Sequence, residues 1–424
     1  MDCGLLVLSL MKGIKLMTTE THYDLYGPTF KRDPYPSYAE MRAKTPIYQN
    51  PGFTNEGMIW FVTGYAEAEA ILRDHKRFVK NYRSTLTPEQ LAQEPPMPRL
   101  AQLLDNHMLN LDGKDHMRQR TLVNKAFTTR MVNGMQDRVQ RIADELLDQV
   151  QARGTMDLID EYAFPLPIIV IAEMLGVPAS DRDRFRAWSD AFVTPARDEA
   201  EWQKFERLLN EFIDYLGKIF DARRRAPRHD LITALIQAEE GGDKLREEEL
   251  YGMVVLLIVA GHETTVNLIG NGTLALLRNP EQLAQLKKNP ALMPAAIEEL
   301  LRYDGPVERA TMRFAAEDVT IAGQLIRRGE PVVAVLAGAD HDPAAFNQPD
   351  QLDLTRDSSR HLAFGYGVHY CVGAPLARME GRIALNTLLQ RLPNLHLTTP
   401  VAELTWRFNP ILRGMQHLPV AWES

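Results

Sequence analysis

The chain has 424 residues, of which 45% are hydrophobic and 25% charged, so it is long enough to bury a large core. Its formal net charge of −8 at pH 7 argues against a nucleic-acid-binding protein, because no basic excess is available to neutralise phosphates. No long Gly/Ser/Pro linker, internal repeat or low-complexity tract marks a boundary between domains.

The N-terminal sequence and the cysteine count bear on the cellular compartment. Cys3 and Cys371 are the two cysteines and allow one disulfide at most, which fits a reducing cytoplasm. The apolar run at residues 5–10 is far shorter than the ~20 residues of a membrane span. Asp2 rather than a basic residue precedes that run, so neither a signal peptide nor membrane insertion is expected. Residues 1–16 are expected to form an extension outside the fold.

The first hundred residues predict a mixture of helices and strands. Residues 35–43 and 65–73 have helical patterns. Between them, residues 47–48 and 59–63 have the β-branched and aromatic content of a hairpin. Residues 84–104 carry several prolines among scattered apolar side chains, and these prolines exclude a long helix.

A pair of basic residues follows in a helical stretch. His116 and Arg120 are four residues apart, so they lie on one face of a helix. The pair has two interpretations: a solvated basic face, or a grip on an anionic group, since charge-assisted bonds to a carboxylate are strong. Residues 130–240 then predict several amphipathic helices whose apolar spacing indicates core packing.

Residues 247–277 predict a long helix. Its apolar stretch at residues 253–260 is too short for a membrane span and fits a helix buried through the middle of the protein. The polar residues His262, Glu263 and Thr264 follow, and buried polar groups need partners. One interpretation is structural, because a threonine hydroxyl can bond the carbonyl four residues back and bend the helix. The other interpretation is catalytic.

Three further elements are predicted beyond this helix. A helix begins at residue 294 and carries Glu299 and Arg302, a spacing that on its own indicates a surface ion pair contributing ~0.2–0.5 kcal/mol. Residues 306–313 have a strand-like pattern, and residues 378–389 have a helical one.

The most specific pattern lies at residues 364–373, Phe-Gly-Tyr-Gly-Val-His-Tyr-Cys-Val-Gly. Its glycines allow the backbone to approach a flat ligand or to turn amides toward an anion. A helical pattern follows at once, with Pro375 in the opening turn, where a missing N–H is harmless. The helix N-terminus is expected to lower the pKa of the Cys371 thiol and to hold a thiolate suited to bind a metal. The alternative is a buried, inert cysteine in a turn.

This stretch resembles the haem-binding loop of the cytochrome P450 family, and the resemblance extends from about residue 23 to the C-terminus. It implies a mainly α fold with small β-sheets, in a single catalytic domain over residues 17–424. The cofactor is expected to be haem b (iron protoporphyrin IX), buried between the long central helix, the Cys-bearing loop and the helix after it.

The resemblance also implies roles for individual residues. Cys371 matches the axial iron ligand of the family. The matches to its haem-propionate ligands are His116, Arg120, Arg313 and His369. Further contacts with the haem are implied for Ala260, Gly261, Phe364 and Gly365. Thr264 and Glu263 match an alcohol–acid pair that delivers protons during oxygen activation, and such general-acid catalysis contributes ~10²–10⁴ in rate.

Another group of residues matches the family in a structural role. Glu299, Arg302 and Arg356 match its network of ion pairs. Near the C-terminus, residues 411–414 are expected to form the last turn that faces the substrate.

The function implied is that of a monooxygenase, which inserts one oxygen atom from O₂ into an apolar organic substrate by hydroxylation or epoxidation. The expected substrates are fatty acyl chains, macrolides, terpenoids or steroids. Electrons are expected from a ferredoxin or flavodoxin with its NAD(P)H reductase, and the enzyme is expected to be a cytoplasmic monomer. The basic residues predicted to dock an acidic ferredoxin are Arg118, Lys125, Arg130, Arg378 and Arg382.

Two other functions compete with this one. A peroxide-driven peroxygenase is the first, and the Glu263–Thr264 pair argues against it because such relatives usually lack an acid–alcohol pair. A haem-based sensor is the second. A sensor needs no proton relay and normally carries an output domain, which the sequence does not indicate.

Overall fold

The computed structural model describes residues 22–53, 57–97, 102–103, 105–193 and 198–423. These residues are mainly helical with a few small sheets, as predicted. The helices of the first half are α2 (Pro28–Arg32), α3 (Tyr35–Lys44), α4 (Tyr65–Arg73), α5 (Pro88–Gln93), α7 (Gly113–Ala126), α8 (Thr129–Gly134), α9 (Gln136–Val150), α10 (Pro165–Leu175), α11 (Arg182–Val193) and α12 (Glu199–Arg225). Those of the second half are α13 (Leu231–Gln237), α14 (Glu247–Arg278), α15 (Pro280–Lys288), α16 (Met293–Asp304), α17 (Leu336–Asp340) and α18 (Ala374–Arg391).

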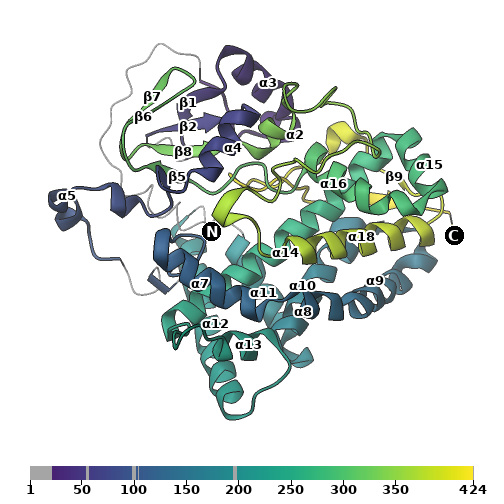
Figure 1. Cartoon of the computed structure of the whole chain (residues 1–424). Coiled ribbons are helices and arrows are strands. Elements are labelled where there is room, and N and C mark those ends of the chain that lie inside the picture. Colours follow the sequence, from purple (N-terminus) through teal and green to yellow (C-terminus); the bar gives the residue numbers. More distant parts are fainter. Residues whose placement is uncertain (1–21, 54–56, 98–101, 104, 194–197, 424) are drawn as a thin grey trace.

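The strands lie mostly to one side of the helical body, beside α3 and α4 (Figure 1). A five-stranded sheet has the order β1 (Ile47–Pro51), β2 (Met58–Val62), β8 (Pro331–Ala334), β5 (Arg313–Ala315) and β3 (Phe78–Val79). Its β2 and β8 are parallel and its other pairs antiparallel. The second sheet has the order β4 (Thr155–Asp157), β10 (Pro419–Ala421) and β9 (His396–Leu397), and a hairpin is formed by β6 (Val319–Ile321) and β7 (Gln324–Ile326).

The longest helix, α14, runs through the helical body and contacts α10, α11, α16 and α18 (Figure 1). Glutamates in its first turn and Arg278 in its last turn complement the helix dipole, and Pro280 opens α15 directly after it. Among the described residues, α14 is also the helix whose length and hydropathy are sufficient to cross a membrane. However, 72% of its most apolar window is buried inside the protein, as in a core helix.

The helix α18 begins directly after the Cys-bearing loop and packs against α9, α14 and α16. Pro375 occupies its first turn, as predicted. Gly381 allows the close approach to α14, because a Cβ at this position would lie 2.9 Å from Leu268 Cδ2. The Cys-bearing loop and the central helix are therefore held next to each other by helix packing.

Most of the predicted elements are confirmed. The helices predicted at residues 35–43 and 65–73 are α3 and α4, and the predicted hairpin is β1–β2. The strand expected at residues 306–313 is wrong, since β5 begins only at Arg313. The preceding backbone bonds elsewhere: the amides of Glu308 and Arg309 both donate to the carbonyl of Ile411.

Two predictions about the organisation of the chain stay predictions. The expected extension at residues 1–16 lies outside the described residues. The second is that residues 17–424 form one catalytic domain.

Candidate active site

A largely apolar cavity lies between α14, α18 and the Cys-bearing loop. The predicted site residues on its wall are Ala260, Gly261, Thr264, Arg313, Phe364, Gly365, His369 and Cys371. Glu263, His116 and Arg120 do not line it. Segments more than a hundred residues apart in the sequence therefore meet at one cavity, largely as predicted.

The conformation of the Cys-bearing loop depends on its glycines. Gly365 and Gly367 have φ of 70° and 75°, in the left-handed region that glycine adopts most easily. At Gly367 the chain also passes α4 closely, since a Cβ there would lie 2.8 Å from the carbonyl oxygen of Leu72. The amide of Cys371 donates to the carbonyl of Phe364 at 3.0 Å, which closes the loop.

The protonation of Cys371 differs from the expectation. Burial raises the pKa of its thiol, although the amides of Gly373 and Ala374 and the guanidinium of Arg120 act in the opposite direction. The prediction that the helix N-terminus by itself holds a thiolate is therefore wrong, because desolvation outweighs the amides and the nearby charge.

Three basic side chains gather beside the loop and form a basic cluster: His116, His369 and Arg313. The rings of His116 and His369 are 4.2 Å apart. Burial, followed by the charges of Arg313 and Lys80, lowers the pKa of His369 to about 2. Burial also lowers the pKa of Arg313 to about 10. These shifts describe a buried site that is already rich in positive charge and disfavours more.

The same basic cluster fits the carboxylates of a haem. Among the described residues, no hydrogen-bond partner exists for the buried Nε2 of His116 or for Nε and Nη1 of Arg313. Unpaired buried donors are unfavourable, and an anionic acceptor satisfies them through strong charge-assisted bonds. The residues present are thus compatible with haem propionates.

Arg120 and Lys80 have positions that the sequence did not reveal. Arg120 Nη1 donates to the carbonyl of Tyr370 at 2.8 Å, so it braces the residue before Cys371. Lys80 is buried, and its Nζ donates to Thr311 Oγ1 and to the carbonyl of Met312, each at 2.6 Å. Lys80 therefore adds a cation to the basic cluster, from a segment where no motif identified it.

The polar residues of α14 point in different directions. Thr264 lines the cavity, and its hydroxyl donates to the carbonyl of Ala260 at 2.6 Å. This is the bond of the structural interpretation. The side chain of Glu263 is only 4% exposed and pairs with Arg407. His262 Nδ1 lies 3.0 Å from Ser189 Oγ, so this residue contacts α11 and not the cavity.

Glu380 is a cavity residue that sequence reasoning missed. It lies on α18, is 1% exposed, and its Oε2 has no hydrogen-bond partner among the described residues. Burial raises its pKa to about 8, and a hydrogen bond with Thr265 opposes this shift. Its signal in the sequence was an acid on the buried face of the helix after Cys371.

The turn expected to face the substrate is wrong, and several cations predicted for docking form ion pairs within the chain. Arg413, in the turn expected to face the substrate, is buried and donates to Asp304 Oδ1 at 2.6 Å, and residues 411–414 do not line the cavity. Of the cations predicted for docking, Arg118 pairs with Glu249 and Lys125 with Glu240. Arg378 pairs with Glu298 through bonds of 2.7 and 2.8 Å.

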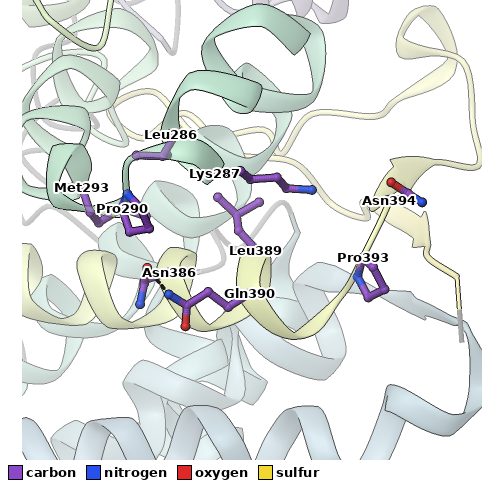
Figure 2. Close-up of a pocket in the computed structure, with 9 residues that line it drawn as sticks. All are labelled: Leu286, Lys287, Pro290, Met293, Asn386, Leu389, Gln390, Pro393 and Asn394. Atoms are coloured by element: carbon purple, nitrogen blue, oxygen red, sulfur yellow. Dashed lines mark hydrogen bonds between the residues drawn. The ribbon is translucent and has the colours of Figure 1, made fainter.

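A second hollow lies at the far end of α18 (Figure 2). It is lined by Leu286, Lys287, Pro290, Met293, Asn386, Leu389, Gln390, Pro393 and Asn394. None of the predicted site residues lies there, and no acid, histidine or cysteine is on its wall. The cavity beside Cys371 is therefore the candidate active site.

Comparison with known proteins identifies the family. The family model for cytochrome P450 matches residues 171–403. A cytochrome P450 of Bacillus subtilis (strain 168) is 44% identical over 409 residues, which are 96% of this chain and 98% of that protein. The cytochrome P450 monooxygenase PikC of Streptomyces venezuelae is 46% identical over 400 residues, which are 93% of this chain and 92% of that protein.

The solved structures agree with the sequence relatives. The crystal structure of the myxobacterial cytochrome P450 CYP267B1 in complex with myristic acid has a TM-score of 0.87 at 41% identity, and the match covers 95% of this chain and 99% of that chain. The cofactor of this family is haem. The chain belongs to the cytochrome P450 family and is a haem-dependent monooxygenase that uses O₂, a small organic substrate and redox partners.

Proposed function

We propose that Cys371 ligates the haem iron and that the cavity beside it is where an apolar substrate is oxidised. The observation that carries this proposal is the presence of Cys371, Thr264 and Arg313 on the wall of one apolar cavity. Thiolate-ligated haem supplies the activation of dioxygen, and the thiolate favours cleavage of the O–O bond.

This chain's residues would hold the cofactor from two sides. His116, Arg120, Arg313 and His369 would bind its propionates. Arg120 also keeps the Cys-bearing loop in place through the carbonyl of Tyr370. The residues that would contact the macrocycle are the small Ala260 and Gly261 on α14, and Phe364 and Gly365 of the loop.

Thr264 and Glu263 deliver protons in this proposal. The reaction uses O₂, two electrons and two protons, and it leaves one oxygen atom in the product and the other in water. The hydroxyl of Thr264 lies on the cavity wall, so rotation away from the carbonyl of Ala260 turns its proton toward the cavity. Glu263 lies next to it in α14 and supplies the link to solvent.

The substrate is proposed from the cavity wall and from the relatives. Most of the wall is apolar, with Ile171, Leu257, Val307, Ala310 and Leu336 among its residues. Such a wall suits long-chain fatty acids, macrolides, terpenoids or steroids. Myristic acid is the first probe, because it is bound in the similar CYP267B1 structure.

The electron donor is proposed to be a ferredoxin or flavodoxin with its NAD(P)H reductase, acting on a cytoplasmic, monomeric enzyme. The charge of −8 and the two cysteines support a protein of a reducing, aqueous compartment.

The ligand role of Cys371 is tested by Cys371→Ser, with Cys3→Ser as the matched control. We expect Cys371→Ser to lose the thiolate-type absorption band of the reduced, CO-bound protein, because a serine hydroxyl replaces the sulfur donor. The control is expected to keep that band. A Cys371→Ser protein that retains it shows that another residue is the iron ligand.

A further inference from the structure

A row of polar residues follows one side of α14 beside the candidate active site. Glu263, Asn267 and Asn271 are each four residues apart, so they lie on one face of the helix. All three residues are buried, with solvent-exposed fractions of 3%, 1% and 0%. Polar side chains that are buried in a row need hydrogen-bond partners or water.

The face is covered by a hairpin-like segment near the C-terminus. Trp406 and Met415 form an antiparallel bridge, and the amide of Arg407 donates to the carbonyl of Gly414 at 2.8 Å. Gly414 permits close contact with α14, since a Cβ there would lie 1.8 Å from Asn267 Oδ1. This segment, residues 405–416, is therefore seated directly on the polar face of α14.

The contacts along this seam are specific. Asn271 Nδ2 donates to the carbonyl of Arg413 at 3.0 Å. Oδ1 of Asn267 is buried and has no hydrogen-bond partner among the described residues, which leaves an acceptor inside the seam. At the end nearest Thr264, Arg407 Nη1 lies 3.3 Å from Oε1 and 3.4 Å from Oε2 of Glu263.

Arg407 joins the buried acid to the surface. Its side chain is 29% exposed, whereas that of Glu263 is 4% exposed. Its Nε donates to the carbonyl of Met415 at 3.2 Å, so the guanidinium is fixed to the hairpin-like segment while it faces the carboxylate. A positive charge within reach of both carboxylate oxygens attracts that carboxylate and restricts its orientation.

We propose that Arg407 is a positioning residue for proton delivery, which orients the Glu263 carboxylate and connects it to solvent. This proposal rests on the proposed role of Glu263 in the reaction. At 3.3 and 3.4 Å, one nitrogen of Arg407 is within reach of both carboxylate oxygens, so it holds the carboxylate next to a side chain that is itself 29% exposed.

A purely structural role for Arg407 makes a different prediction. In that case its bond to the carbonyl of Met415 secures the hairpin-like segment, and the charge next to Glu263 has no effect on catalysis. Lysine separates the two roles, because Arg407→Lys keeps the positive charge near Glu263 but lacks the planar guanidinium that reaches both partners.

The test uses the haem-loaded enzyme and a fatty acid that it oxidises. It measures the fraction of reducing equivalents that is released as peroxide. We expect Arg407→Met to raise this fraction about two- to fivefold, a change within the range that a partly exposed ion pair commands. Arg407→Lys is expected to restore most of the coupling. Arg138→Met is the matched control, since Arg138 is 25% exposed and pairs with Glu173 on another face.

Glu263→Gln separates this proposal from the proposed function. In the Glu263→Gln background, Arg407→Met is expected to cause no further leak, because the two residues act through one carboxylate. If Glu263→Gln leaks peroxide and Arg407→Met does not, Arg407 has no positioning role. If Arg407→Lys leaks as much as Arg407→Met, the role is structural. Full coupling in Glu263→Gln removes Glu263 itself from proton delivery, and the role of Arg407 with it.

A second readout needs no turnover. The carboxylate band of Glu263 in the infrared spectrum of the resting protein is identified by subtraction of the Glu263→Gln spectrum. We expect Arg407→Met to shift this band and Arg138→Met to leave it unchanged. An unshifted band shows that the guanidinium does not act on the carboxylate.

Discussion

The buried acid Glu380 makes the free energy of unfolding depend on pH. Its pKa of about 8, raised by burial, exceeds the ordinary value of 4.5. Between these two pH values the unfolded chain loses a proton that the folded protein keeps. The free energy of unfolding therefore falls as pH rises through this window.

Glu380→Gln is expected to remove this loss of stability, because the amide is isosteric and stays neutral. At pH 5 the variant and the wild type are expected to unfold at nearly the same denaturant concentration. At pH 8 the variant is expected to be more stable by about 1–3 kcal/mol, measured by equilibrium chemical denaturation. Glu281→Gln, at an exposed position on α15, is the control and is expected to show no such trend. Equal wild-type and Glu380→Gln stability at both pH values contradicts the prediction.

The residues that could be predicted from sequence are those whose pattern is local. Cys371 and His369 lie within one ten-residue stretch, and Thr264 lies in one turn of a helix, so a short motif is enough to assign each to the cavity whose wall they form. Lys80, Glu380 and Arg407 could not be identified in this way. Each owes its environment to a partner from a distant segment: Lys80 to Thr311, Glu380 to Thr265, and Arg407 to Glu263.

At the scale of elements, the helix α16 is tied to the segment after α17 by a buried ion-pair network. The side chains of Glu299 and Arg302 have no solvent exposure, and their two bonds are 2.7 and 2.8 Å long. Arg356 reaches Glu299 at 3.2 Å, and Ser358 donates to it at 2.5 Å. The surface ion pair indicated by spacing alone is therefore replaced by the structural network that the family resemblance implied.

Arg302→Ala is expected to destabilise the protein by about 3–5 kcal/mol, because it leaves a buried carboxylate without its main partner. That loss is a large share of a typical unfolding free energy of ~5–15 kcal/mol, so the yield of haem-loaded protein should also fall. Chemical denaturation and haem content per chain measure the effect. The control, Arg138→Ala, removes a partly exposed pair and is expected to change stability by no more than about 1 kcal/mol. If the two variants are equally stable, the network contributes no more than a surface pair.

The elements themselves were predictable where hydrophobic periodicity is strong. The apolar stretch of α14 and the proline at the start of α18 are features of consecutive residues. Residues 306–313 have strand-like residue types, but the partner of this backbone is the carbonyl of Ile411, about a hundred residues later. Tertiary hydrogen bonds thus override the local β pattern, and the periodicity of the sequence cannot predict them.

At the scale of the whole molecule, the average charge does not describe every part of the surface. The net charge is −8, yet Arg130 on α8 and Arg382 on α18, two helices in contact, are exposed and form no ion pair with a described residue. Tyr366 and Tyr370 in the Cys-bearing loop are 38% and 39% exposed. Rates of encounter follow such a local patch more than the net charge.

The docking of an acidic ferredoxin beside the Cys-bearing loop is therefore best tested at Arg130 and Arg382. Arg378, which was expected to take part, pairs with Glu298, so its replacement would disturb the packing of α18 on α16. We expect Arg130→Glu combined with Arg382→Glu to slow the first reduction of the haem by a ferredoxin and to weaken its dependence on salt, because exposed charges are screened over ~8–10 Å at physiological ionic strength. Stopped-flow reduction at increasing salt measures both effects.

The charge-matched control is Lys287→Glu combined with Lys288→Glu on α15. Lys287 lies near Asn386 and Gln390 of α18, which are about 20 Å along that helix from its start. If this control slows reduction as much as the Arg130 and Arg382 pair does, net charge and not a docking face governs the encounter.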